Sequence, residues 1–291
     1  MIAQVILSGL LIGGIYALVS IGLNLIFGVM RIINFAHGEF LMLSMYAAYW
    51  LWRLGIDPYI AIVLVVPLMA LLGALTERFL IRFTLEARAH VKIFVTLGLA
   101  IALQNLALLF FTADYMSVRT PYQTATWSVA GLFVSVPRLI ACAFMFAAAS
   151  CLHLFLYRTD FGKAIRATAQ DSTTARLMGI DVDRVYMATF AIGTGFVGLA
   201  GCLLTPIYYV YPSVGTDFVL VAFVVVVLGG LGSLPGALIG GLLIGVVEQL
   251  SGFFIDTSLR QIVYFALFIG VLVVRPAGLF GERGAEEYGL K

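Results

Sequence analysis

Residues 1–28 read MIAQVILSGLLIGGIYALVSIGLNLIFG and form one apolar stretch without a charged side chain. A helix needs about 20 apolar residues to cross a bilayer, and this stretch is also longer than the hydrophobic region of a signal peptide. It has no basic leader, so we expect a membrane span that the mature protein retains. Gly9, Gly13 and Ala17 recur at every fourth position, a spacing that lets two helix backbones approach closely and pack.

The whole chain is unusually apolar. Hydrophobic residues make up 62% of its 291 residues and charged residues 11%, whereas about a quarter of a soluble domain is charged. This composition indicates an all-α integral membrane protein, a polytopic bundle in a single transmembrane domain over residues 1–291. The net charge of +2 is too small to indicate nucleic-acid binding. Cys142, Cys151 and Cys202 lie in apolar runs, so we expect no disulfide.

Apolar runs of sufficient length predict the helices of this bundle. The candidate spans are residues 4–29, 38–52, 59–80, 91–112, 137–157, 185–207, 216–231, 236–253 and 260–275. The runs at 38–52 and 216–231 are short for a span, so we expect tilted or broken helices there. We therefore predict about eight to ten crossings. The mixture of Thr, Tyr, Trp, Pro and Gly at 113–136 predicts a capping turn or a short hairpin.

One long polar insert interrupts the apolar pattern. Residues 158–184 read RTDFGKAIRATAQDSTTARLMGIDVDR, with five Arg or Lys and four Asp residues, and charge is costly in hydrocarbon. Cytoplasmic loops retain Lys and Arg, which places the insert in the cytoplasm; the side of the N-terminus depends on counting every short span correctly. With the N-terminus outside, the outer basic residues are Arg53, Arg119, Arg138 and Arg260. The inner ones are then Arg31, Arg78, Arg82, Arg88, Lys92, Arg158, Lys163, Arg166, Arg176, Arg184, Arg275, Arg283 and Lys291.

The insert predicts two short helices. Thr159 or Asp160 can cap a first helix that runs through Gln170, and Asp171 or Ser172 can cap a second one, which a glycine ends. The second helix offers a compact apolar knob, which consists of Ala175, Leu177, Met178 and the flanking Ile180. Such a knob suits a short helix inserted in the groove of another protein. The alternative is an amphipathic helix that lies on the lipid surface.

A glycine-rich run at residues 229–241 reads GGLGSLPGALIGG. Its small residues repeat the spacing of a helix-packing face at Gly232, Gly236 and Gly240. The run also contains a serine and a proline that break a helix, which favours a tight cytoplasmic turn. The alternative is a discontinuous helix that lines a transport path.

Few polar groups lie within or beside the apolar runs, and these are the candidates for a translocation path. Residues 31–40 read RIINFAHGEF, and helical geometry would place Asn34 near His37. This segment is either an inner-side turn with capping roles or a bend that lines the path or braces against a partner. Further path candidates, each equally able to form an interhelical hydrogen bond, are Asn24, Gln104 and Asn105.

Two short stretches match motifs for cofactor binding in whole or in part, but neither has the surrounding sequence that such a site requires. The match GTGFVG at residues 193–198 lies inside an apolar run with no strand before it, so it predicts a packing face and not a dinucleotide site. Gly162 and Lys163 lack the first glycine and the hydroxyl of a phosphate loop, so any ATP chemistry belongs to a partner. The three histidines are scattered and predict no metal site. We expect a protein without catalytic residues and without a bound cofactor.

Four motifs, in order along the chain, resemble those of one known family. They are NFAHGEF at 34–40, GKAIRATAQDSTTARLMGID at 162–181, GGLGSLPGALIGG at 229–241 and RPAGLFG at 275–281. With these motifs, essentially the whole chain resembles the LivH-type permeases of bacterial branched-chain amino acid ABC importers. The resemblance implies a type II importer fold and a multi-pass protein of the bacterial inner membrane.

The resemblance also implies partners. A LivM-type subunit would complete the pore, two cytoplasmic ATPases would bind ATP and Mg²⁺ beneath it, and a periplasmic binding protein would deliver the substrate. The portion from Ala175 to Gly179 looks like the core of the loop through which ABC permeases contact their ATPases, which makes it the coupling helix. The residues assigned to ATPase coupling are Gly162, Arg166, Asp171, Ala175, Arg176, Leu177, Met178 and Gly179.

The expected function is import of branched-chain or related amino acids from the periplasm to the cytoplasm. Similar permeases serve urea or short amides, or small aromatic or carboxylic acids, so the substrate stays open. The alternative from another class is a self-sufficient secondary transporter or channel, which would move substrate when the chain is reconstituted alone. An intramembrane enzyme is disfavoured by the missing catalytic groups.

Overall fold

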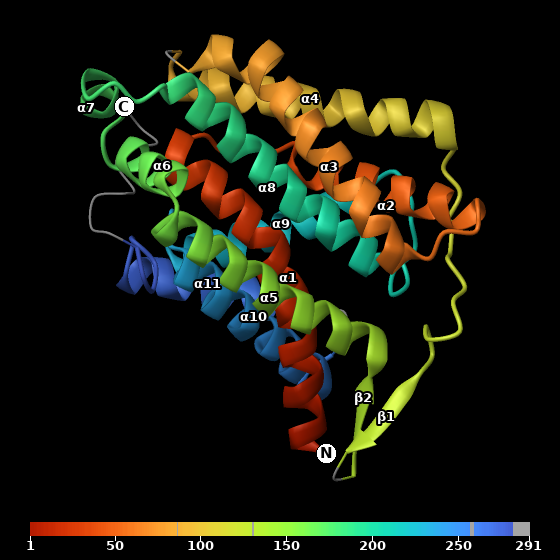
Figure 1. Cartoon of the computed structure of the whole chain (residues 1–291). Helices are drawn as coiled ribbons and strands as arrows, with labels where there is room; N and C mark the ends of the chain where they lie inside the picture. Colours follow the sequence, from red (N-terminus) through yellow and green to blue (C-terminus); the bar gives the residue numbers. More distant parts are fainter. Residues whose placement is uncertain (86, 130, 257–258, 282–291) are drawn as a thin grey trace.

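The computed structural model describes residues 1–85, 87–129, 131–256 and 259–281 and shows a helical bundle with one small β-hairpin (Figure 1). The long helices are α1 (Ile2–Met30), α3 (Pro58–Thr76), α4 (Ala89–Phe111), α5 (Val136–Arg158), α8 (Val182–Leu204) and α10 (Leu234–Phe254). The shorter helices are α2 (His37–Arg53), α9 (Val214–Gly229), α11 (Arg260–Val274) and, in the polar insert, α6 (Asp160–Gln170) and α7 (Ser172–Leu177). α3 continues into a π-helical segment and a 3-10 turn, which are η1 (Glu77–Ile81) and η2 (Arg82–Thr84). The antiparallel hairpin, which the loop composition predicts, consists of β1 (Thr126–Val129) and β2 (Leu132–Ser135).

Each predicted span coincides with one helix, because a backbone removed from water must satisfy its hydrogen bonds within its own segment. By length and composition, the described helices able to cross a membrane are the 6 that begin at Ile2, Pro58, Ala89, Val136, Val182 and Leu234. α9 and α11 are apolar but shorter. The predicted lower limit of eight crossings is therefore reached only if these two also cross.

α1 is the central helix, and small residues let α10 lie directly against it. A Cβ on Gly13 would lie 2.7 Å from the carbonyl oxygen of Gly241, and a Cβ on Gly9 would lie 2.6 Å from the Cα of Val246. Gly245 of α10 approaches the same stretch of α1. The contact is therefore formed by two backbones, which leaves no room for side chains between them.

The second glycine repeat joins α9 to α10 through a tight turn. α9 ends at Gly229, and a serine caps α10 immediately after the turn. Gly236 and Gly240 both pack against Gly229, so these two positions hold α9 and α10 together. Gly232 has a φ of +82° within the turn and lies against Gly28 of α1. Of the two alternatives for this segment, the turn is the one that forms.

The GTGFVG face packs helices on two sides. Gly193 of α8 lies against Gly22 of α1, and Gly198 faces Met69 of α3. α8 is thereby held between the central helix and α3, which is its most extensively packed neighbour. The glycines serve backbone packing, as their apolar context predicts.

α2 starts inside the molecule and not at its surface. α1 is closed by Arg31 in a left-handed conformation (φ 53°, ψ 41°), and the chain then folds back without regular structure until His37. His37 hydrogen-bonds to the backbone of Val19 in α1, and Gly38 touches Gly215 in the first turn of α9. Both short helices therefore begin in the interior, which explains why their apolar runs are too short for a complete span.

The two ends of the bundle carry different structures (Figure 1). At one end the N-terminus meets the hairpin, where the Gln4 side chain exchanges two hydrogen bonds with the backbone of Phe133 at 2.7 and 2.8 Å. The opposite end carries α6 and α7, and Arg31 and Lys92 lie beside them. This arrangement agrees with the predicted grouping of inner basic residues. The members of that group outside the described residues are Arg283 and Lys291.

Candidate functional site

The polar insert folds into the two short helices that its capping residues predict. Thr159 begins α6, because its hydroxyl accepts a hydrogen bond of 3.0 Å from a backbone N–H in the first turn. Asp171 begins α7, because its carboxylate accepts hydrogen bonds from the N–H groups of Thr173 at 2.9 Å and Thr174 at 3.1 Å. Gly179 follows α7 with a φ of 85°, a conformation that a glycine adopts without strain.

The Asp171 carboxylate is held in its charged form. Hydrogen bonds from the hydroxyl and the N–H of Thr174 lower the pKa of this carboxyl below its ordinary value, and the nearby Arg31 lowers the pKa further. Because Arg31 closes the central helix, this attraction joins the start of α7 to the end of α1.

The C-terminal end of α7 exposes two large apolar side chains, beside the exposed polar residues Thr173, Thr174 and Arg176. Leu177 exposes 83% of its surface and Met178 exposes 78%, whereas Ala175 exposes 4%. The prediction that Ala175 belongs to an exposed knob is therefore wrong. Two positions along a helix correspond to about 200° of rotation, so when Leu177 faces outward, Ala175 must face the bundle. Ile180 is partly buried against the core, so the exposed knob consists of Leu177 and Met178.

Gly162 and Arg166, which were assigned to coupling, both contact the end of α5, Gly162 as a buried residue and Arg166 as an exposed one. A Cβ on Gly162 would lie 2.6 Å from the Cα of Leu156, so the glycine allows α6 to lie against the end of α5. The Arg166 side chain donates a hydrogen bond to the carbonyl oxygen of Leu156 at 3.1 Å and stacks over the ring of Tyr157. Both residues hold α6 in place, and their contacts are within this chain.

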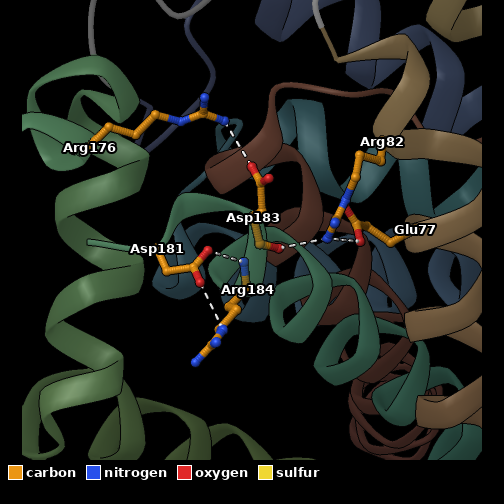
Figure 2. A network of polar contacts seen from close by, with 6 residues as sticks. All are labelled: Glu77, Arg82, Arg176, Asp181, Asp183 and Arg184. Carbon is orange, nitrogen blue, oxygen red and sulfur yellow. Dashed lines mark hydrogen bonds and ion pairs between the residues drawn. The ribbon is translucent and has the colours of Figure 1, made fainter. Parts of the chain in front are cut away.

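Arg176 ties α7 to the bundle through a chain of polar contacts (Figure 2). Its guanidinium pairs with the carboxylate of Asp183, at the start of α8, at 2.8 Å. The backbone carbonyl of Asp183 accepts a hydrogen bond from Arg82 at 3.2 Å, and Arg82 forms an ion pair of 3.2 Å with Glu77. A separate ion pair, between Asp181 and Arg184, closes the first turn of α8. The contacts therefore run from α7 through the start of α8 to the end of α3.

Glu77 is the innermost member of this chain of contacts, because its side chain has no exposed surface. It begins η1, the π-helical segment that ends the α3 span. Glu77, Arg82 and Asp183 were not among the predicted site residues. The charge of Glu77 at the end of a long apolar run was the available signal. Asp183, whose backbone carbonyl accepts the bond from Arg82, is about a hundred residues away from Arg82, and only the fold brings these two together.

The bend before α2 forms a second polar site, buried in the bundle. Asn34 caps the bend, since its side-chain oxygen accepts a hydrogen bond from the N–H of Ala36 at 3.1 Å. His37 contacts the carbonyl oxygen of Val19 through Nε2 at 3.0 Å, and Glu39 hydrogen-bonds to Thr216 of α9. One side-chain atom each of Asn34, His37 and Glu39 is buried without a partner. The segment is thus both a capped turn and an interior bend with unused polar groups.

The remaining path candidates lie elsewhere. Asn24 donates to the carbonyl oxygen of Ser233 at 2.6 Å and accepts from the N–H of Gly232 at 2.7 Å, so its amide holds the α9–α10 turn against α1. The interhelical hydrogen bond accounts for its contacts. Gln104 and Asn105 lie on α4, far from the bend in sequence, and Asn105 is exposed. The structure therefore brings Asn34 and His37 together but not the other three.

No group of three or more His, Cys, Asp or Glu side chains that could hold a metal ion occurs among the described residues. The three cysteines are free thiols. The described residues do form an exposed apolar knob, a polar connection from α7 into the bundle, and a buried polar bend.

Comparison with known proteins places the chain in a family. Residues 5–272 match the family model described as branched-chain amino acid transport system, permease component. The high-affinity branched-chain amino acid transport system permease protein LivH of Salmonella typhimurium is 34% identical over 300 residues, which cover 98% of this chain and 97% of that protein. The corresponding permease protein BraD of Pseudomonas aeruginosa is 32% identical, over 98% of this chain and 97% of its own length.

A more distant relative is the probable branched-chain amino acid transport permease protein LivH of Methanocaldococcus jannaschii, which is 27% identical over 96% of this chain and 92% of its own length. No solved structure matches the chain. The family match covers every described helix of the bundle except the first residues of α1 and the last residues of α11. The chain is a multi-pass membrane protein and belongs to the family of permease components of branched-chain amino acid transport systems.

Proposed function

We propose that this chain is one of two pore-forming subunits of an ATP-driven importer in a bacterial inner membrane, with the 158–184 insert on the cytoplasmic side. The observation that carries the proposal is the exposed pair Leu177 and Met178 on α7, a capped helix outside the membrane spans. A rigid helix with apolar anchors and a basic neighbour suits a groove on another protein. In this proposal the groove belongs to a separate ATPase subunit, which binds ATP and Mg²⁺, and this chain has no catalytic role.

The contacts of Arg176 support a coupling role for α7. A force on α7 would act on α8 through the Arg176–Asp183 ion pair, and on α3 through the bond from Arg82 to the Asp183 backbone. α8 and α3 are extensively packed on each other, so they would move as one unit. ATP can shift the permease between its inward-open and outward-open states only if it binds more tightly to one of them. The contacts of Arg176 would transmit this difference in binding free energy from the ATPase to the bundle.

The exposed face of α4 supports a second permease subunit. Polar side chains are costly against lipid, and Gln104 and Asn105 lie well inside this 23-residue apolar helix. The side-chain amide of Asn105 donates one hydrogen bond, to the carbonyl oxygen of Ile101 at 2.7 Å, and its other hydrogen-bonding groups remain available. We propose that this face meets the partner subunit and that the two residues line their shared path.

The buried bend supports a translocation route near α2 and α9. Backbone that is neither helix nor strand is tolerated at membrane depth only where protein or a water-filled cavity surrounds it. Here the unpaired atoms of Asn34, His37 and Glu39 lie at the point where both short helices begin. In the proposal these groups face the substrate path when the short helices separate.

The substrate class is proposed from the relatives, whose names specify branched-chain amino acids. We propose leucine, isoleucine, valine or related amino acids, delivered by a periplasmic binding protein. Calorimetric titration of the cognate binding protein with amino acids, urea and aromatic acids would test this. If the binding protein bound urea or an aromatic acid and no amino acid, the proposed substrate would be wrong, while the proposed type of transporter would stand.

The coupling role is tested by the double variant Leu177→Glu, Met178→Glu in cells that express the complete transporter. Charge on the knob should abolish co-purification of the ATPase and reduce uptake at least about tenfold, while the membrane level of the chain stays unchanged. The matched control exchanges the two side chains, Leu177→Met with Met178→Leu, and should retain both. Normal uptake and ATPase association in the double variant would contradict the proposal. Uptake by the chain reconstituted alone would instead support a self-sufficient transporter.

A further inference from the structure

A cavity of about 460 Å³ lies between α7 and the bundle. Its walls come from the end of α1, the bend that follows, the start of α4, the junction of α6 and α7, and Tyr186 of α8. A volume of this size is in the range of sites for small molecules. The cavity also touches the two parts that would have to move relative to each other during coupling, so a bound molecule would affect that movement.

The cavity wall carries charges of both signs. Arg31 and Lys92 line it with positive charge, and Asp171 lines it with negative charge. Arg31 interacts with Asp171, whereas Lys92 has no carboxylate partner within the described part of the chain. Lys92 is therefore available to a carboxylate that enters the cavity.

A buried hydroxyl also lines the cavity. Thr168 exposes only 2% of its surface, and its Oγ1 has no hydrogen-bond partner. A buried polar atom without a partner costs free energy, so such atoms in native proteins call for an explanation such as an absent ligand or water. The apolar side chains of Phe27, Ile33 and Ile93 complete the wall.

The backbone of Arg31 is a second sign of a built site. Its φ of 53° lies in the region that glycine or asparagine adopts more cheaply, yet an arginine closes α1 here and lines the cavity. Strained positions of this kind cluster at functional sites and are held by the surrounding structure. Arg31 and Asp171 both line the cavity, and the positive charge of Arg31 acts on the Asp171 carboxylate.

We propose that this cavity binds an apolar α-amino acid, the transported product, from the cytoplasmic side and that the bound molecule slows further import. Its carboxylate would meet Lys92 and the Thr168 hydroxyl, its ammonium would meet Asp171, and its aliphatic side chain would contact Phe27, Ile33 and Ile93. The bound molecule would join α7 to α1 and α4, which stabilises one arrangement of the coupling helix over the other. The inference rests on the proposed function, because it takes the product to be an amino acid.

Proteoliposomes with the complete transporter, external binding protein and labelled leucine test the inference. Unlabelled leucine inside the vesicles should slow the initial rate of ATP-driven uptake by the native protein. Lys92→Met and Thr168→Val should each raise the half-inhibitory internal concentration at least about tenfold, the effect of one lost charge-assisted or buried hydrogen bond. Lys163→Met is the matched control, since this lysine lies on the insert but outside the cavity and pairs with Asp160. It should leave the inhibition unchanged.

Equilibrium binding of labelled leucine to the purified transporter, without nucleotide or binding protein, measures the cavity directly. Weaker binding in Lys92→Met, with native binding in Lys163→Met, supports the inference; equal binding in both overturns it. Uptake that is equally fast in leucine-loaded and in empty vesicles also overturns it while leaving the proposed function intact. Absence of any leucine uptake would remove the proposed function, and the binding measurement would then decide on the cavity alone.

Discussion

At the scale of single residues, the ion pair between Glu77 and Arg82 is the most sensitive contact. Glu77 has no exposed surface, and 32% of the Arg82 side chain is exposed. Arg82→Met would leave a buried carboxylate without its partner and should lower the free energy of unfolding by about 1–3 kcal/mol, less than for a fully buried pair because solvent screens part of the interaction. The measurement is the thermal unfolding transition in detergent.

The double variant Glu77→Met, Arg82→Met provides the control for this prediction. Removing both charges also removes the uncompensated carboxylate, so much of the lost stability should return. If the double variant is less stable than the native protein by the sum of the two single effects, the two residues act independently and the ion pair is not the cause.

Asp171 makes the order of α7 depend on pH. Its pKa in the folded protein is lowered by Thr174 and then by Arg31, so its capping contribution is complete above the ordinary aspartate pKa of about 3.9 and is lost as the pH falls through the lowered value. Amide hydrogen exchange of Thr173 and Thr174, corrected for intrinsic rates, should show lower protection at pH 3 than at pH 7. Asp171→Asn keeps a capping oxygen without the titration, so protection in that variant should not fall.

At the scale of helices, the close approach of α1 and α10 determines which substitutions the bundle tolerates at the glycines between them. A Cβ on Gly13 meets the α10 backbone at 2.7 Å, whereas a Cβ on Gly98 of α4 meets nothing within 4 Å. Gly13→Ala should therefore destabilise the protein by about 1–3 kcal/mol, because the two backbones must separate. Gly98→Ala, the matched control, should be neutral or slightly stabilising, because alanine is the better helix former. Equal melting temperatures for the two variants would show that α1 and α10 are not in backbone contact.

The helices were largely predictable from the sequence, because their signals are local. Apolar length fixes the spans, and Thr159 and Asp171 cap the insert helices through bonds to residues only two or three positions away. The orientation of α7 was not predictable in the same way. Burial of Ala175 depends on which face of a six-residue helix meets the bundle, and no apolar periodicity over so short a segment specifies that face.

The contacts between residues that are distant in the sequence could not be predicted either. The connection from Arg176 to Glu77 joins residues from two distant segments. In the sequence, each of these charged residues could equally well be a surface residue that contacts only water. The five predicted path residues illustrate the same limit. Asn34 and His37 share a bend because they are neighbours in sequence, whereas Asn24 bonds to a turn about two hundred residues away.

At the scale of the whole molecule, the two ends of the bundle differ, and in the proposed assembly one end faces outward and the other meets a partner. The hairpin covers the end of α1, while the opposite end combines an exposed apolar knob, basic residues and a cavity. In the proposed transporter, a movement of the knob on α7 would reach α8 and α3 through the Arg176–Asp183 contacts, and both helices belong to the bundle that surrounds the buried bend. That design requires the insert to face the compartment that holds ATP.

The sidedness of the insert gives a direct test of the whole molecule. In a variant with Cys142, Cys151 and Cys202 replaced by alanine, Thr173→Cys should react with a membrane-impermeant maleimide only after the cells are permeabilised. Ala113→Cys, in the exposed loop before the hairpin, should react in intact cells and serves as the matched control. Both positions lie in segments outside the helices long enough to span, so the result depends on topology and not on burial in lipid. Labelling of Thr173→Cys in intact cells, with Ala113→Cys protected, would show that the chain has the opposite orientation in the membrane. The knob would then face a compartment without ATP, which contradicts the proposed coupling.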